Sequence, residues 1–291
     1  MKKILALVLA SVMTFSMVAC AANTEEPAPA AKAEAAATEA ATEVAKEEAK
    51  EEATEAEKIV FTMGIDPEYP PFSYLGDDGE YTGFDVEICR AACEKLGWDF
   101  QVFGVNWDEK LVQLDAGECD CVWSGMTILD SMYDAGYVIS DPYYYNTQVL
   151  LVKSDSGIKS ADDLAGKVVA VQLGTSGETL LNEDLVDLRD TFGELVTCDS
   201  FLKCFTELDG GAADAVFVDL PVAASYAAGK DGYDIINEDL GAEQYGVAFR
   251  ADDQAVCDAI EGAVAELVAD GTYAKIAEKY PDIVENLIFL Q

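Results

Sequence analysis

An apolar stretch that begins at Cys119 gives way to small polar residues, and these are the first candidates for contacts with a ligand. Apolar and polar residues alternate up to Ser124, which predicts a strand over residues 120–124. A strand that ends there exposes Ser124, the Gly125 backbone and the Thr127 hydroxyl at its carboxyl end. Ligands of open α/β sheets bind at this edge, so we expect a ligand to be held here.

A proline-rich loop after the first predicted strand places an acid among aromatic residues. In GIDPEYPPFSYL, residues 64–75, three prolines restrict the backbone around Asp66, Tyr69, Phe72 and Tyr74. An acid beside aromatic rings can hold a cationic or zwitterionic ligand, although such a loop can also serve packing alone.

A turn rich in glycine and hydroxyl groups forms a third candidate. KVVAVQLGTSGE, residues 167–178, places Gly174, Thr175, Ser176 and Gly177 between a predicted strand and a predicted helix. Free backbone N–H groups and the positive end of the helix dipole predict a seat for an anion. The turn lacks the lysine of a phosphate-binding loop, so a carboxylate fits better than a phosphate. A simple N-cap by Thr175 or Ser176 is the alternative.

Asp219 is the last of the polar candidates. It ends a predicted strand in ADAVFVDLP, residues 213–221, and precedes a helix that begins at a proline. A carboxylate in this position can pair with an ammonium group or cap the helix, and the two roles are compatible.

Composition favours binding over catalysis. The chain contains no histidine, which excludes a Ser-His-Asp triad and a histidine-ligated zinc site. Its 56 acidic and 18 basic residues give a formal charge of -38, which argues against nucleic acid and anionic lipid as partners of the folded part. With 51% hydrophobic residues, the 291-residue chain can build a sizeable core in one large domain or two ordinary ones.

The first 57 residues predict export and a tether. Lys2 and Lys3 precede an apolar run, and small residues follow, which predicts a signal peptide over residues 1–19 that is too short to span a membrane. The run Met17 to Cys20 resembles a bacterial lipobox, which implies that Cys20 is acylated; an ordinary secreted protein with a spare thiol is the alternative. Residues 20–57 are almost all Ala, Glu, Thr, Lys and Pro, which predicts a disordered tether after the lipidated cysteine.

From Lys58 onward, short apolar segments alternate with helical patterns, which predicts an α/β sheet with crossover connections. We expect strands at residues 59–64, 100–105, 120–124, 148–152, 168–172, 195–198, 215–218 and 246–249. We expect helices at residues 85–96, 108–116, 177–188, 202–210, 221–228 and 255–269, with Gly97 ending the first of them.

The order of these segments resembles the extracellular solute-binding proteins of family 3, which serve ATP-binding-cassette (ABC) importers of polar amino acids. The resemblance covers nearly all of residues 58–280 and rests on GIDPEYPPFSY, YTGFDVEICRAACEKLG, NWDEKLVQLDAGECDCVWSGMTI, SDPYYY, LAGKVVAVQLGTSGE, ADAVFVD and YGVAFR. It implies a type II periplasmic-binding-protein fold with two α/β lobes joined by a two-strand hinge. Lobe 1 would be residues 58–146 plus 246–291, and lobe 2 residues 147–245.

The same resemblance implies a function. The chain would be a lipid-anchored, monomeric receptor on the extracellular face of the cell membrane, needing no cofactor. It would close on an amino acid or similar small zwitterion and deliver it to a membrane permease. A binding protein for a dipeptide, an amine or another amino-acid derivative is the alternative, as is a dehydratase-like enzyme on the same fold. The absence of histidine and of an evident basic residue in the site loops disfavours the enzyme.

Contacts carry over from the family residue by residue. On the side-chain end of the ligand, the resemblance implies that Asp66 and Tyr69 face the ligand and that Phe72 and Trp107 form aromatic walls. The other implied contacts go to the α-amino and α-carboxylate groups. Gly125 and Thr127 take either group, Thr175 and Ser176 donate to the carboxylate, and Asp219 accepts from the ammonium.

Met132 departs from the family pattern. The family usually has an arginine about five residues beyond Thr127, forked onto the carboxylate, and this chain has Met132 there. Without it a carboxylate relies on hydroxyls and backbone donors. Lys110 is the nearest basic candidate, but a lysine on a helix one turn past Trp107 is more often solvated, and its direction stays open.

The cysteines predict buried thiols. Cys89 and Cys93 share a helix face, and Cys119 and Cys121 share a strand face, as small buried hydrophobic residues do. A four-thiolate metal site is a weaker alternative, because the spacing matches no strong zinc pattern. Beyond Cys20 the number of cysteines is odd, and the best candidates for a disulfide are Cys198 and Cys204.

Replacing Cys20 by serine tests the predicted anchor. The serine side chain lacks the thiol that is acylated, so we expect Cys20→Ser to move the protein from the membrane fraction to the medium. Cell fractionation and immunoblotting measure this change. A variant that stays in the membrane fraction contradicts the lipid anchor.

Overall fold

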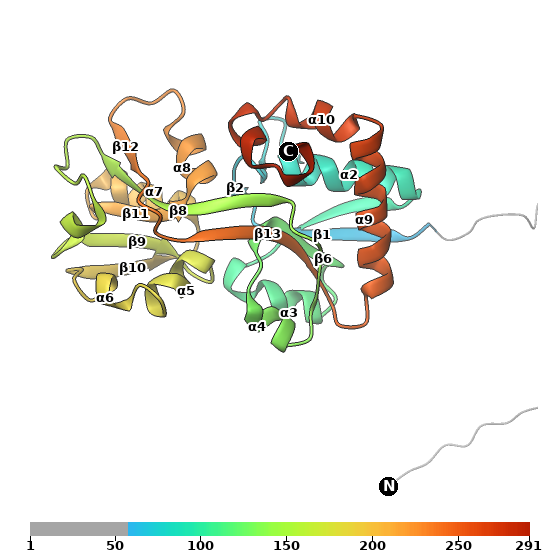
Figure 1. The fold of residues 1–291 in the computed structure, drawn as a ribbon, viewed down its shortest axis with the longest axis horizontal. Helices are drawn as coiled ribbons and strands as arrows, with labels where there is room; N and C mark the ends of the chain where they lie inside the picture. The colour runs from blue at the N-terminus through green and yellow to red at the C-terminus, as the bar shows by residue number, and fades with distance from the viewer. Residues whose placement is uncertain (1–57) are drawn as a thin grey trace, which may run out of the picture. The chain divides into compact units, whose positions relative to one another are not determined.

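The structure, a computed structural model, describes residues 58–291, and the predicted signal peptide, Cys20 and tether lie outside the described residues. The described part forms two α/β lobes linked by the long strands β8 (Tyr144–Lys153) and β13 (Ala242–Phe249), as Figure 1 shows. This confirms the predicted fold class.

The first lobe is built on a sheet with strand order β13-β6-β1-β5, in which β1 is parallel to both β5 and β6 and β13 is antiparallel to β6. Its other strands are β1 (Val60–Ile65), β5 (Asp99–Gly104), β6 (Cys121–Thr127) and β7 (Val138–Ile139), with a small separate sheet of β2 (Glu68–Tyr69), β3 (Ser73–Leu75) and β4 (Tyr81–Thr82). Its helices are α2 (Phe84–Leu96), α3 (Lys110–Asp115), α4 (Asp130–Asp134), α9 (Gln254–Ala269) and α10 (Thr272–Ala277), with 3-10 turns η1 (Trp107–Glu109), η3 (Pro281–Asn286) and η4 (Ile288–Leu290).

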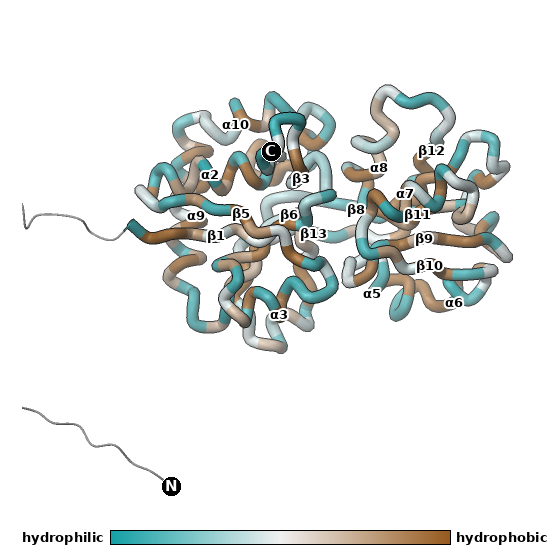
Figure 2. Tube along the Cα trace, turned by 180° about the vertical axis from the view of Figure 1, so that it is seen from behind, coloured by the Kyte–Doolittle hydropathy of each residue, from teal (hydrophilic) through white to brown (hydrophobic). Residues whose placement is uncertain are grey.

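The second lobe has strand order β10-β9-β11-β8, and β12 pairs with β8. Its remaining strands are β9 (Val168–Gln172), β10 (Glu194–Cys198), β11 (Ala215–Asp219) and β12 (Tyr233–Ile236). Its helices are α5 (Ser176–Asn182), α6 (Val186–Arg189), α7 (Phe201–Gly210), α8 (Leu220–Ala227) and the 3-10 turn η2 (Ala161–Leu164). In Figure 2 the central strand β9 is hydrophobic and the outer loops are hydrophilic, as expected for a sheet covered by helices.

The two long strands pair with each other before they separate. Residues 144–147 of β8 lie antiparallel to residues 242–245 of β13. Beyond this segment β8 pairs with β11 and β12, whereas β13 pairs with β6. Both connections between the lobes are therefore extended backbone, which can bend at a few residues while each sheet stays intact.

The predicted helices and strands are largely present, with two informative differences. Strand β6 runs to Thr127 instead of ending at Ser124, because Thr127 still pairs with Tyr245 of β13. The helix predicted at residues 177–188 is two helices that break at Glu183, where adjacent carboxylates meet the negative end of α5. Gly97 ends α2 in the left-handed conformation, as predicted.

All seven cysteines beyond Cys20 are buried and free. This confirms the small buried thiols expected at Cys89, Cys93, Cys119 and Cys121. The predicted disulfide between Cys198 and Cys204 is wrong: the two side chains are neighbours, but neither sulfur is bonded to the other. Within residues 58–291 no group of His, Cys, Asp or Glu side chains is placed to hold a metal ion. The helices of the same range are all too short or too polar to cross a membrane.

Asp85, in the first turn of α2, ties this helix to strand β6. Its Oδ2 accepts hydrogen bonds from the Gly125 N–H at 2.8 Å and from the Tyr143 hydroxyl at 2.6 Å. The side chain is fully buried, and because burial disfavours the charged carboxylate, the pKa of Asp85 rises to about 7. No cationic side chain offsets this within the described ion pairs.

Asp85→Asn should flatten the pH dependence of stability. Asp85 binds its proton more tightly in the folded chain than in the unfolded chain. The contribution of Asp85 to the free energy of unfolding is therefore fully present below about pH 4 and is lost as pH rises toward about pH 7. Relative to the variant, we expect the wild type to lose on the order of 4 kcal/mol of unfolding free energy across this window. Urea titrations at several pH values measure this. Asp77→Asn, at an exposed position, is the control. If the unfolding free energies of wild type and Asp85→Asn change in parallel with pH, the raised pKa of Asp85 is contradicted.

Candidate ligand site between the lobes

A small pocket between the lobes is lined by residues of both. The first lobe contributes Tyr69, Trp107, Lys110, Gly125, Met126, Thr127, Leu129 and Met132, and the second lobe contributes Gly174, Thr175, Ser176 and Asp219. Most of the predicted site residues therefore come together in space, although they are spread over about 150 positions of the chain.

Asp219 forms the acidic end of this pocket. Asp219 stands at the N-cap position of α8, but its side chain makes no cap hydrogen bond, and the carboxylate turns toward the two long strands. Asn146 and Gln148 of β8 donate to its Oδ1 at 2.6 and 2.8 Å, and the Tyr245 hydroxyl of β13 donates at 3.0 Å. Burial, and then the nearby charge of Glu243, raise the pKa of Asp219 well above its usual value.

Glu243 shares the donors of Asp219. Asn146 and Gln148 also donate to Glu243 Oε1, at 2.6 and 3.0 Å. Two carboxylates are thus held close together by amide groups, and neither belongs to any ion pair among residues 58–291. Such a pair of acids without a cation is ready to accept an ammonium group.

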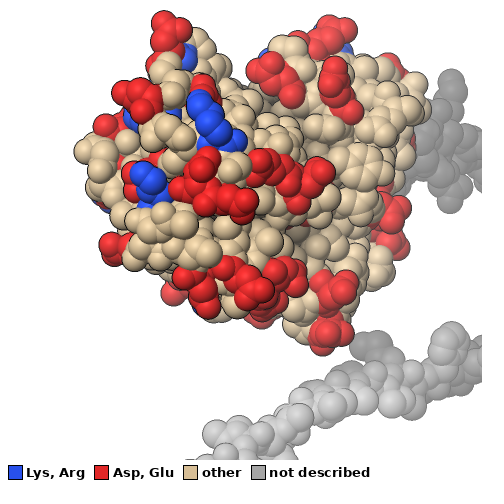
Figure 3. Space-filling model, turned by 60° about the vertical axis from the view of Figure 1, so that its left-hand side comes forward, with Lys and Arg blue, Asp and Glu red and all other residues tan. Residues whose placement is uncertain are grey.

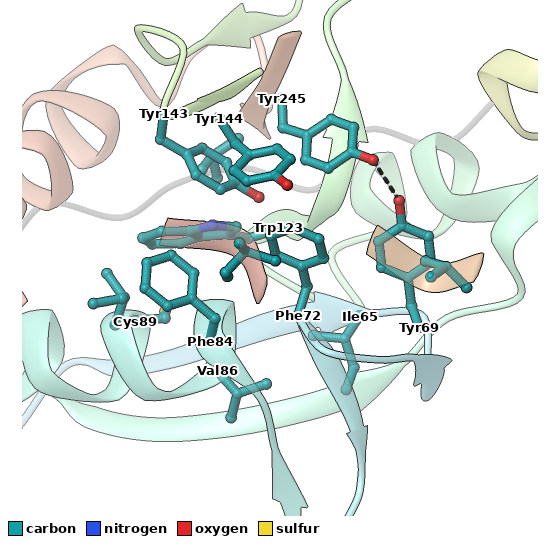
Figure 4. Packing of buried hydrophobic residues seen from close by; sticks show 14 of the residues in the cluster. Ile65, Tyr69, Phe72, Phe84, Val86, Cys89, Trp123, Tyr143, Tyr144 and Tyr245 are labelled. Atoms are coloured by element: carbon teal, nitrogen blue, oxygen red, sulfur yellow. Dashed lines mark hydrogen bonds between the residues drawn. The ribbon is translucent and has the colours of Figure 1, made fainter. Parts of the chain in front are cut away.

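Tyr69 and Trp107 supply the aromatic walls. Their rings stack with centroids 6.5 Å apart. The Tyr69 hydroxyl meets the Tyr245 hydroxyl at 2.7 Å, the contact drawn as a dashed line in Figure 4. Phe72 does not line the pocket. It is 0% exposed and packs edge-on against Tyr144 and Tyr245, so it supports the wall from the core.

Asp66 joins the two lobes. Gln172 at the end of β9 donates its Nε2–H to Asp66 Oδ2 at 2.7 Å, and the Glu68 N–H donates to the other oxygen. Burial raises the pKa of Asp66. Asp66 lines an adjoining pocket with Gln172 and Trp107 instead of the pocket that holds Asp219.

The turn before α5 is partly occupied by its own side chains. Thr175 is the N-cap and accepts from the Glu178 N–H at 3.2 Å, so the simple capping alternative is confirmed for Thr175. The Gly174 N–H donates to the Glu178 carboxylate at 2.7 Å. Part of the predicted anion seat is therefore filled by Glu178. Ser176 accepts a hydrogen bond from Thr127 of the other lobe at 3.0 Å.

Ser124 and the Gly125 N–H are not available to a ligand. The prediction that Ser124 is exposed is wrong, because β6 continues past it. It is 0% exposed and bonds to the Asp66 N–H and to Ser73. The Gly125 N–H is held by Asp85, although Gly125 itself lines the pocket.

Lys110 points into the space between the lobes. Its Nζ donates to the carbonyl oxygens of Gly174 at 2.7 Å and Trp107 at 3.1 Å, and it lies 4.8 Å from the centroid of the Trp107 ring. Burial lowers the pKa of Lys110 to about 8. The general expectation of a solvated lysine is wrong here, because the second lobe covers it.

Sequence reasoning missed the residues on the crossing strands. Asn146 and Gln148 are two positions apart, so they lie on one face of β8. Two amides on one face of an otherwise apolar strand were the available signal. Nothing in the local sequence marks Gln172 or Glu243, which reach the site only through the packing of the lobes.

The chain is similar to known solute-binding proteins. Residues 61–282 match the model of the bacterial extracellular solute-binding proteins, family 3. The L-cystine-binding protein TcyJ of Escherichia coli K12 is 34% identical over 229 residues, 77% of this chain and 83% of that protein.

Solved structures show the same fold. A substrate-binding protein of an ABC uptake transporter from Streptococcus pneumoniae with bound histidine has a TM-score of 0.72 and 28% identity, covering 76% of this chain and 91% of that chain. An ancestral arginine-binding protein bound to arginine has a TM-score of 0.69 and 34% identity, covering 76% of this chain and 97% of that chain. These matches confirm the resemblance and the type II periplasmic-binding-protein fold expected from the sequence.

Gly174→Ala should weaken ligand binding by obstructing closure. Gly174 has φ +74°, and an added Cβ would overlap the Cα of Asp108 in the first lobe. Gly166→Ala is a matched control, because Gly166 has the same φ and nothing lies near the added atom. Both variants carry a backbone strain of about 1 kcal/mol. We expect calorimetry with the protein's co-purified solute to show at least about tenfold weaker binding for Gly174→Ala alone. Equal affinities of the two variants would contradict the role of this contact.

Proposed function

Because the chain belongs to the bacterial extracellular solute-binding proteins, family 3, we propose that it is the solute-binding subunit of an ABC importer. It captures a small solute of the amino-acid and amine class by closure of two lobes. The observation that carries the proposal is one pocket lined from both sides, with Tyr69, Trp107 and Thr127 on one lobe and Ser176 and Asp219 on the other.

Closure supplies contacts that the open protein lacks. Thr127 with Ser176, Asp66 with Gln172, and Lys110 with Gly174 each join the two lobes. A solute that touches both walls binds the closed arrangement better than the open one and so shifts the population toward it. We place the lobe boundaries near residues 146 and 246, where β8 and β13 leave their shared segment.

The solute is oriented by charge at one end and by aromatic rings at the other. Asp219 accepts hydrogen bonds from its ammonium group, and Tyr69 and Trp107 enclose its side chain. The hydroxyls of Thr127 and Ser176 provide neutral donors and acceptors between these ends. The relatives named for cystine, histidine and arginine support this class of solute.

The cell surface is the proposed place of action. Acylation of Cys20 would anchor the protein to the outer side of the cell membrane, and residues 20–57 would tether the lobes near the permease that receives the solute. This role needs no catalysis and no cofactor, and one copy of the chain forms the whole site.

Asp219→Asn tests the site directly. Native protein is denatured, and the released solute is identified by mass spectrometry; calorimetry then measures its affinity. We expect Asp219→Asn to weaken binding by about 2–5 kcal/mol, because the ammonium loses its buried partner. The exposed Asp187→Asn of the same lobe should bind like the wild type. A thermal-shift screen without response to any amino acid, dipeptide or amine would count against the proposed function.

A further inference from the structure

The pocket between the lobes contains no arginine that could hold a carboxylate. The three arginines of the chain are all placed elsewhere. Arg90 lies over the Phe100 ring, Arg189 bonds to Asp190 and Asn182, and Arg250 bonds to Asp120 and Asp253.

An apolar wall stands where a carboxylate-binding side chain is expected. Met132 is 4% exposed and lines the pocket together with Leu129 and Met126. A carboxylate placed against thioether and methyl groups loses its hydration and gains no hydrogen bond in return. This wall therefore favours an uncharged or apolar portion of the solute.

Lys110 does not replace the missing arginine. Two of its three N–H groups already donate to backbone carbonyls, which are the oxygens of Trp107 and Gly174. The carboxylates of Asp108, Asp66 and Glu178 act on the same ammonium and offset its charge. Its remaining N–H is a single donor, in contrast to the planar fork of an arginine.

Hydrogen-bond acceptors are in excess at the acidic end of the site. Asp219 and Glu243 share two amide donors, and the donors that reach Asp219 all end on Oδ1. Asn146 Oδ1 is also buried and has no donor among residues 58–291. Buried acceptors without donors are rare in folded proteins, and an ammonium group supplies up to three N–H donors to such a cluster.

The mouth of the cleft continues this acidic character. A groove that shares Thr127, Leu129 and Ser176 with the pocket is lined by four acids and by no lysine or arginine: Asp130, Glu183, Asp184 and Glu243. Figure 3 shows carboxylates spread over both lobes, with basic side chains confined to a few places. This field attracts a cation toward the cleft and repels an anion.

We propose that the solute is an organic cation that carries an amine and has no free carboxylate beside it. The inference rests on the proposed function, because it uses the same site. The amine binds at Asp219 and Glu243, and the carbon next to it lies against Met132. A linear diamine can extend its second amine into the acidic groove.

Matched ligand pairs test this inference with the full-length chain. Calorimetry compares lysine with cadaverine and arginine with agmatine, since each pair differs only in the carboxylate. We expect the carboxylate-free member of at least one pair to bind about tenfold tighter or more. Tighter or equal binding of the amino acids overturns the inference and leaves the proposed function standing. Binding of no member of either pair overturns it as well, and a negative wider screen then also counts against the proposed function.

Two variants, each with a control, identify the residues responsible for the preference for a carboxylate-free amine. Met132→Arg should shift the preference in each pair at least about tenfold toward the amino acid, whereas an arginine at the neighbouring exposed position, Tyr133→Arg, should leave the ratio unchanged. Glu243→Gln should weaken amine binding about tenfold, with the exposed Glu194→Gln as its control. Circular dichroism confirms that each variant is folded. An unchanged ratio in Met132→Arg, or unchanged amine binding in Glu243→Gln, overturns the inference.

Discussion

The buried carboxylate of Asp219 is the constraint around which the site is organised. A carboxylate out of water needs donors, and in residues 58–291 these are neutral amides and a phenol instead of a cation. The donors come from β8 and β13, the two strands that connect the lobes. In the proposed function, the charge that attracts a solute is therefore held by the same backbone that would bend as the lobes open and close.

This placement links binding to closure. The Tyr245 hydroxyl contacts both Asp219 of the second lobe and Tyr69 of the first, so it lies between the acidic end of the pocket and its aromatic wall. A solute ammonium that adds donors at Asp219 relieves an electrostatic cost present in the empty closed state. Asp219 and Glu243 pair with Gln148 and Asn146 of the same strand β8, so a bound cation would offset their mutual repulsion directly.

Support for the first-lobe wall comes from a second buried acid. Asp85 holds the N–H of Gly125 in a left-handed conformation, φ +54°, where a side chain would overlap the Tyr69 ring. Glycine is thus required at this position by both backbone geometry and close packing. Met132 adds an apolar surface to the first-lobe side of the pocket, which in our proposal would disfavour a carboxylate.

Hydrophobic periodicity, Gly97 and the turn at Gly174 act locally, so they predicted the alternating strands and helices of an α/β chain. The division into two lobes came from the family resemblance. The sequence by itself also marked Tyr69, Thr127, Ser176 and Asp219, since each follows or ends a predicted element near a sheet edge, whereas Trp107 came from the family resemblance. Tertiary structure decided the rest. Pairing of β6 with β13 buried Ser124, and the cover of the second lobe turned Lys110 inward. Gln172, Asn146, Gln148 and Glu243 became part of the site only through the approach of strands and lobes distant in the chain. Local pattern cannot specify these contacts, because they depend on which surfaces meet after the elements have formed.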